Sequence, residues 1–280
     1  MARSRFGFRI RGAAKSGAPM KAKEKRSREM PHYSRKDAIR VVPLHKPEAQ
    51  AIAPASAPKL VYRGGPLITS VEVFAIFWGA SWKEEPSAGI LAQLNQFFDF
   101  VLTSSLMDQL SEYSVPGQSI GHGNRTGSVT VPAPAPSATL TDQAIQQFLQ
   151  QEISSNAAFP QPSPNTLYFV FVPPGTTVEQ GGSSSCQQFC GYHDAIGTEI
   201  FYAVMPFPNC AGCLGGVSQI DALTSTSSHE LCEAITDPIP GQGWYDDANG
   251  EIGDICAWKT KKLGNFAVQL EWSNRAGKCL

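Results

Sequence analysis

The chain has 280 residues, enough for one large domain or two small ones. Its formal net charge of −1 hides an uneven distribution: residues 1–60 carry 15 Lys and Arg against 4 Asp and Glu, and residues 61–280 carry 8 against 20. No segment approaches the roughly 20 consecutive apolar residues of a transmembrane helix, so no such span is expected. The sequence therefore predicts a basic tail on an acidic globular body.

Residues 1–59 are predicted to be a disordered basic tail and linker. They show almost no apolar periodicity and contain a charged run at 21–28 and an Ala- and Pro-rich run at 49–58. Such a segment buries too little apolar surface to offset the entropy lost on ordering. A basic arm could contact nucleic acid or an anionic membrane, but a disordered leader or an over-extended gene start is the preferred interpretation, so nucleic-acid binding by the tail is not expected. No signal-peptide core is visible in it.

The body, residues 60–280, alternates predicted strands and helices. Runs of β-branched and aromatic residues predict strands at 71–78, 128–131, 167–172 and 200–205. Apolar residues at helical spacing predict one helix over 89–112 and a second, capped by Thr141, that includes Ile145 and Ile153. A third helix contains His229. This order predicts an α/β fold, with α+β as the alternative, built on a mixed, largely parallel sheet with flanking helices.

The segment from His229 to Glu233 reads His-Glu-x-x-Glu on the third helix. Residues four apart lie one turn apart on the same helical face, which suits two ligands of one metal ion. In the related pattern H-E-x-x-H, two histidines bind zinc and the glutamate acts as general base. By analogy, His229 and Glu233 are predicted ligands and Glu230 the predicted base.

The opposite face of this helix is apolar. It is expected to pack on the core and to leave His229 and Glu233 solvated, because helical spacing places together Ile220, Leu223, Leu231 and Ile235. An ordinary amphipathic surface helix with one His and two Glu would give the same pattern. The pattern alone therefore does not establish a metal site.

Residues 243–256 offer further oxygen ligands. Asn249-Gly250 is a strong signal for a tight hairpin turn, whose return strand would carry Glu251 and Asp254. Either carboxylate could be the third ligand. The acidic cluster could also be a calcium loop, but Tyr245 stands where that loop needs its first carboxylate.

Six segments between residues 61 and 280 follow one another in a characteristic order. They are Tyr62-Arg63-Gly64-Gly65-Pro66-Leu67, Cys190-Gly191-Tyr192-His193, Ser228-His229-Glu230-Leu231-Cys232-Glu233-Ala234, Gly243-Trp244-Tyr245-Asp246, Glu251-Ile252-Gly253-Asp254-Ile255-Cys256 and Gln269-Leu270-Glu271-Trp272-Ser273-Asn274. In these segments the chain resembles a distant, bacterial-type member of the Exordium (phosphate-induced protein 1) family.

The resemblance implies a zincin-like metal site in a secreted protein. By position it points to His229 and Glu233 as ligands and Glu230 as base, and it places Glu251 and Asp254 on the family's acidic motif. His193 falls on its Cys-Gly-x-His motif and becomes a further candidate ligand. The family is described mainly through growth and cell-wall phenotypes, so a peptide or a cell-wall-associated substrate is the expected partner.

All seven cysteines lie between residues 186 and 279. Their spacing allows a zinc ribbon, their concentration equally allows the disulfides of an exported domain, and mixed or free thiols are a third alternative. The Exordium resemblance favours disulfides, with the candidates Cys186, Cys190, Cys210, Cys213, Cys256 and Cys279. The seventh, Cys232, is predicted to be a buried free thiol.

The leading functional prediction is a zinc peptidase-like, metal-dependent hydrolase in which Glu230 deprotonates an activated water. Zn²⁺ is the expected ion, with Mn²⁺ or Ca²⁺ as alternatives because carboxylate ligands reduce the preference for zinc. One His with two carboxylates also leaves zinc formally neutral and hence a weaker Lewis acid. The alternative is a non-catalytic, secreted, metal-stabilised binding or signalling protein. An exported location is expected, with a cytoplasmic one as the alternative.

Overall fold

The computed structural model describes residues 41–45 and 57–280, and its centre is a six-stranded sheet. The strand order is β1-β9-β10-β6-β3-β4. The strands are β1 (Val41–Pro43), β3 (Glu72–Trp78), β4 (Asn124–Val131), β6 (Thr166–Phe171), β9 (Phe189–Ile196) and β10 (Ile200–Met205). Strands β10, β6, β3 and β4 run parallel, whereas β1 and β9 pair antiparallel at one edge. The predicted mixed sheet and mixed α/β content are confirmed.

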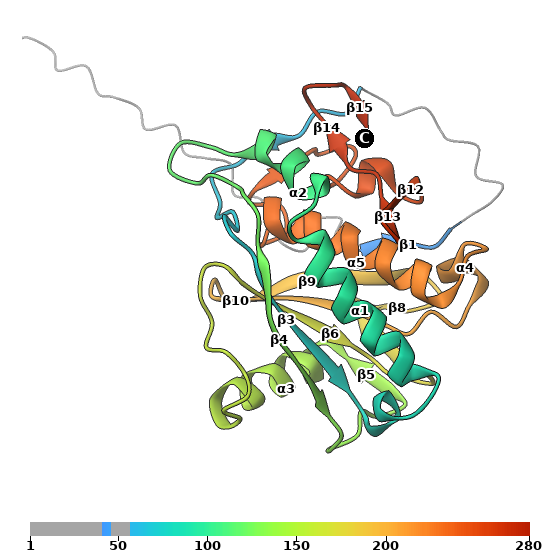
Figure 1. The fold of residues 1–280 in the computed structure, drawn as a ribbon. Coiled ribbons are helices and arrows are strands. Elements are labelled where there is room, and N and C mark those ends of the chain that lie inside the picture. The colour runs from blue at the N-terminus through green and yellow to red at the C-terminus, as the bar shows by residue number, and fades with distance from the viewer. Residues whose placement is uncertain (1–40, 46–56) are drawn as a thin grey trace, which may run out of the picture. The chain divides into compact units, whose positions relative to one another are not determined.

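Helices cover both faces of this sheet (Figure 1). One face packs against α1 (Ser87–Val101) and α5 (Gln219–Thr236), and the other packs against α3 (Asp142–Ser155). In the first core, Phe98 of α1 packs on Phe169 of β6 with ring centroids 4.8 Å apart. Each face of the sheet therefore has its own apolar core, which explains the nearly continuous apolar runs of β3 and β6.

The helix predicted over 89–112 is two helices. It breaks after Val101, and α2 (Ser105–Leu110) begins where the Ser104 hydroxyl accepts a hydrogen bond from the backbone N–H of Leu106 at 3.3 Å. The predicted cap of α3 is confirmed, since the Thr141 hydroxyl accepts from the N–H of Ala144. Apolar residues keep their helical spacing through the break because α1 and α2 bury their apolar side chains in the same core.

The predicted disordered tail contributes one strand. Val41 and Val42 of β1 pair with β9, and the side chain of Val42 is buried against Cys190 and Cys213. The boundary at residue 59 therefore misses residues 41–45, whose short apolar run is long enough to cover a sheet edge. The rest of the predicted tail, 1–40 and 46–56, lies outside the described residues.

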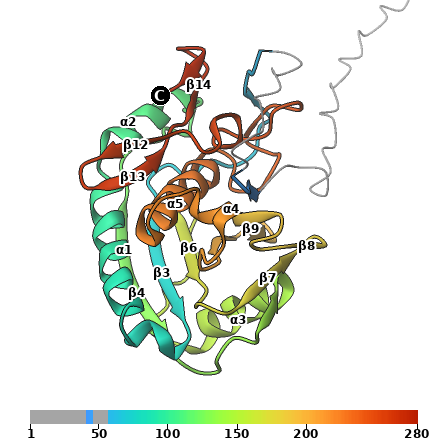
Figure 2. The ribbon, with the colours of Figure 1, turned by 90° about the vertical axis from the view of Figure 1, so that its right-hand side faces the viewer.

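The C-terminal segment lies across α5. The hairpin of β12 (Thr260–Leu263) and β13 (Phe266–Gln269) packs against this helix, and the backbone N–H of Gln269 donates to the Ser228 hydroxyl at 2.9 Å. Figure 2 shows α5 between this hairpin and β9. The helix is thus enclosed on two sides.

The remaining elements are short. They are β2 (Val61–Tyr62), β5 (Thr139–Thr141), β7 (Thr177–Gln180), β8 (Ser183–Ser184), α4 (Ala211–Leu214), β11 (Trp244–Tyr245), β14 (Trp272–Ser273), β15 (Lys278–Cys279) and the 3₁₀ turns η2 (Ala80–Lys83), η3 (Ser111–Tyr113) and η4 (Asp254–Cys256). Among residues 41–45 and 57–280, none of the helices has the length and apolar composition needed to cross a bilayer.

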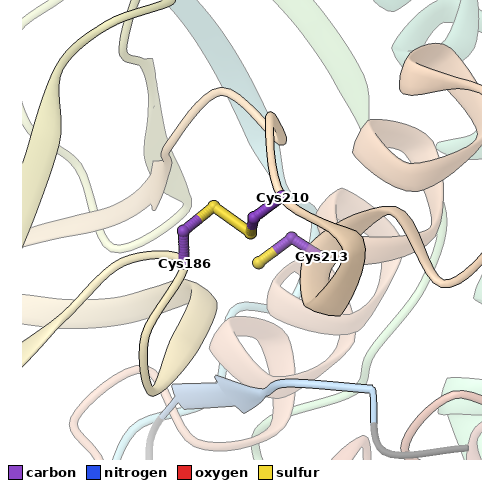
Figure 3. Close-up of side chains that lie close together, drawn as sticks. All are labelled: Cys186, Cys210 and Cys213. Atoms are coloured by element: carbon purple, nitrogen blue, oxygen red, sulfur yellow. A yellow bond between two sulfur atoms is a disulfide. The ribbon is translucent and has the colours of Figure 1, made fainter.

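Three disulfides confirm the preferred interpretation of the cysteines. The pairs are Cys186–Cys210, Cys190–Cys213 and Cys256–Cys279. The first two lie side by side, and Figure 3 shows the Cys213 sulfur beside the Cys186–Cys210 bond. Zinc binds thiolates, so paired sulfurs cannot form the ribbon that the spacing also allowed. Cys232 is unpaired and buried, as predicted.

Replacing Cys256 and Cys279 together by Ser should destabilise the domain. The bond closes a loop with a sequence separation of 23, and losing such a constraint on the unfolded chain costs about 3 kcal/mol. Urea unfolding of the oxidised protein measures this. The double variant of Cys186 and Cys210, with a separation of 24, is the comparison and should lose less, because the Cys190–Cys213 bond still closes most of the same loop. An unchanged urea midpoint for the Cys256 and Cys279 variant would contradict the expected loss.

Candidate metal centre

Helix α5 carries His229, Glu230 and Glu233 into the middle of the domain. It begins after Ser218, whose hydroxyl accepts a hydrogen bond from the N–H of Asp221 at 3.2 Å. After its end, the Asp237 carboxylate accepts hydrogen bonds from the backbone N–H groups of Gly241, Gln242 and Gly243. Caps at both ends therefore hold the candidate residues in a fixed position.

The His229 face of α5 is buried, and the prediction that it is solvated is wrong. His229, Glu230 and Glu233 are each 0% exposed. Strand β9 covers one side and brings in His193, which is also buried. Helical periodicity separates polar from apolar positions, but it cannot show that other polar groups cover the polar face.

Two glycines allow this close approach. A Cβ atom on Gly191 of β9 would lie 2.6 Å from Cγ2 of Thr226 and 3.3 Å from Oε1 of Glu230. A Cβ atom on Gly253 would lie 2.8 Å from the His229 ring and 2.9 Å from Oε1 of Glu233. Any larger residue at either position would push β9 or the 246–256 loop away from the helix.

The hairpin predicted around Asn249-Gly250 is only partly correct. The turn exists, because the N–H of Gly250 donates to the carbonyl of Asp246 at 2.9 Å, but the return strand is wrong. The chain continues into the 3₁₀ turn η4 instead. Glu251 precedes this turn and Asp254 begins it. Both carboxylates form possible ligand groups with Glu233 of α5.

His229, Glu233 and Asp254 form the first of two groups of possible metal ligands. One ligand atom from each lies within 4.8 Å of the others. Nε2 of His229 lies 2.9 Å from Oε1 of Glu233, and the N–H of Asp254 donates to that oxygen at 3.1 Å. Yet neither ring nitrogen of His229 makes an aligned hydrogen bond within the described part of the chain. A separation this short fits an ion pair, in which Glu233 raises the pKa of His229 against the effect of burial, and it also fits two ligands of one cation.

His193, Glu233 and Glu251 form the second group, also within 4.8 Å. Nδ1 of His193 lies 3.0 Å from Oε2 of Glu230 and 3.5 Å from Oε2 of Glu233. Nε2 lies 3.2 Å from the carbonyl oxygen of Asp237 and 3.5 Å from Oε1 of Glu251. The structure therefore brings together all six residues that the sequence singled out.

The electrostatics of the cluster favour positive charge. Burial raises the pKa of Glu230, and it raises the pKa values of Glu251 and Asp254 well above their usual range. Burial would also raise the pKa of Glu233, but the nearby histidines outweigh it and lower that pKa to about 2. Burial opposes the charge on His193, yet Glu230 and Glu233 raise its pKa to about 10. The carboxylates thus stabilise any cation among them.

Unpartnered buried oxygens make the cluster suitable for a metal. Among the described residues, Oε1 of Glu230, Oε2 of Glu233 and both carboxylate oxygens of Glu251 have no hydrogen-bond partner. A buried acceptor left unsatisfied costs about 1–3 kcal/mol, more when it is charged. A divalent cation satisfies several such oxygens at once. Imidazole and carboxylate together suit Zn²⁺ or Mn²⁺, whereas Ca²⁺ prefers oxygen alone.

Two further buried carboxylates were not predicted. Asp237 and Glu271 are both 0% exposed. Burial raises the pKa of Asp237 to about 6, although three backbone N–H groups favour its charged form. Both oxygens of Glu271 lack a hydrogen-bond partner among the residues the structure describes. Asp237 follows the helix directly and precedes a proline, which is a weak signal, and nothing in the spacing marks Glu271.

The chain matches no protein-family model, and no curated protein is similar to it by sequence. The resemblance to the Exordium family therefore remains a prediction that rests on the six segments given above.

Gly253→Ala should disturb both the fold and the centre. The added methyl group would collide with His229 and Glu233, and overpacking of this kind costs about 1–3 kcal/mol. Urea unfolding and Zn²⁺ titration should both show the loss. Gly121→Ala is the matched control, because its Cβ would approach only the Thr69 carbonyl, at 3.9 Å. Equal behaviour of the two variants would show that the contact with Gly253 is unimportant.

Proposed function

We propose that this chain is a divalent-metal-binding protein in which His229, Glu233 and Asp254 hold a zinc ion that stabilises the fold. The observation that carries the proposal is the 2.9 Å approach of His229 Nε2 to Glu233 Oε1 without an aligned hydrogen bond. Mn²⁺ is the first alternative ion, because two of the three ligands are carboxylates, and Ca²⁺ is the second.

The closed geometry supports a binding or signalling protein over an enzyme. A catalytic zinc site keeps one position open to water or substrate, whereas structural sites are closed. His229 and Glu233 are fully buried, with Gly253 packed against them. Three disulfides are typical of oxidising compartments, which supports an exported location over a cytoplasmic one. A peptide or cell-wall-associated partner rests on the Exordium resemblance alone.

A zincin-like hydrolase, most simply a zinc peptidase, is the second candidate. Its support is Oε1 of Glu230, which has no partner among the described residues and belongs to the residue next to His229. A bound ion would supply the charge that polarises a carbonyl and acidifies water. Glu230 would hold the proton, with Oε2 fixed 3.0 Å from His193. This candidate requires the 246–256 loop to move and admit a substrate.

Removing the metal should destabilise the protein. A ligand at a hundred times its Kd stabilises the folded state by about 2.7 kcal/mol. Urea unfolding with saturating Zn²⁺ and with EDTA should therefore differ by about this amount or more. His229→Ala, which removes a ligand of this ion, should reduce the difference. Metal analysis under non-chelating conditions that finds no bound ion in the wild-type protein would refute the proposal.

Glu230→Gln separates the two candidates. The binding protein should keep its metal and show no hydrolysis of a labelled, unfolded protein substrate in either form. The hydrolase should lose about a hundredfold or more in rate, because Gln cannot take up a proton. Glu271→Gln is the matched control, since Glu271 is equally buried but belongs to neither ligand group. Zinc-dependent hydrolysis that Glu230→Gln removes and Glu271→Gln retains would establish the hydrolase.

A further inference from the structure

We infer that the centre holds two divalent cations and that the Glu233 carboxylate bridges them. The inference rests on the proposed function and extends it to a second ion, bound by His193, Glu233 and Glu251. The first ion remains with His229 and Asp254 on the other side of Glu233.

The two oxygens of Glu233 face different histidines. Oε1 lies 2.9 Å from Nε2 of His229, and Oε2 lies 3.5 Å from Nδ1 of His193. A carboxylate whose two oxygens point to two separate sets of nitrogen and oxygen donors has the arrangement of a bridging ligand. In two-metal sites the ions lie about 3.5–4 Å apart, a distance that one bridging carboxylate spans.

The possible ligands sort into two groups and not one. Within the described residues, His229 and Asp254 group with Glu233, and His193 and Glu251 form a separate group with it. Ligands about 2.1 Å from one ion lie within about 4.2 Å of each other. All atoms of each group lie within 4.8 Å of one another, so small shifts suffice within a group. One ion cannot serve both groups as they stand.

Glu251 is the second observation that points to an ion in the His193 group. Its side chain is 0% exposed, and neither carboxylate oxygen has a hydrogen-bond partner among the residues described. Oε1 points toward His193, with 3.5 Å to Nε2. An ion in the His193 group would contact these oxygens directly, whereas an ion held by His229 and Asp254 alone would leave Glu251 with the carboxyl group of Asp237 as its neighbour.

Metal stoichiometry tests the inference directly. Wild-type protein saturated with Zn²⁺ and passed over a chelating resin should retain two ions per chain by elemental analysis. Glu251→Gln and Asp254→Asn should each retain one. Glu271→Gln, which alters an equally buried carboxylate outside both groups, should retain two. Circular dichroism shows whether each variant is folded.

Manganese provides a readout that does not depend on the variants. Two Mn²⁺ ions bridged by Glu233 should give the broadened, exchange-coupled EPR spectrum of a pair, whereas a single ion gives an isolated six-line signal. One zinc per wild-type chain with an uncoupled manganese spectrum overturns the inference and leaves the proposed function intact. No bound ion at all overturns both. If Glu251→Gln fails to fold, the wild-type stoichiometry and spectrum still decide.

Discussion

The structure depends on the contact between α5 and the carboxylates that surround it. Glu230 and Glu233 come from the helix itself, and the 246–256 loop adds Glu251 and Asp254. Buried carboxylates of like charge repel and resist desolvation, so the folded state needs protons or cations among them. His193 and His229 are the basic side chains that the described structure places against these groups. A metal would supply the remaining charge.

Helix α5 is buried along its polar side as well as its apolar side. Polar residues from Thr224 to Ser228 are buried along the helix, as few surface helices would allow. Their neighbours explain it: the Ser228 hydroxyl accepts from the N–H of Gln269, and Thr226 packs against Gly191. The helix therefore behaves as an internal layer between the central sheet and the C-terminal hairpin. The Thr224 and Ser228 hydroxyls also donate to helix carbonyls one turn earlier, so these buried groups have partners within the domain.

Four of the six strands of the central sheet could be predicted from sequence because both faces of the sheet are apolar, whereas β1 and β9 were missed. The run at 200–205 matches β10 at both ends, and 71–78 matches β3 within one residue. Strand β4 begins earlier than predicted, at Asn124, because its first half carries the polar alternation of an edge strand. The six candidate residues were also found, five by local spacing and His193 only through the family resemblance. Their burial could not be found, because it depends on how β9 and the 246–256 loop pack against α5, which helical spacing alone does not show.

Two of the disulfides lie close in sequence to residues of the candidate metal centre. Cys256 lies two residues after Asp254, and its bond to Cys279 fixes the 3₁₀ turn that presents Asp254 to α5. Cys190 lies three residues before His193, and its bond to Cys213 fixes the start of β9. Each side of the cluster is therefore held by its own disulfide. Because such constraints reduce the freedom of ligands before an ion arrives, oxidation of the cysteines should precede tight metal binding. That order suits a protein that folds in an oxidising compartment.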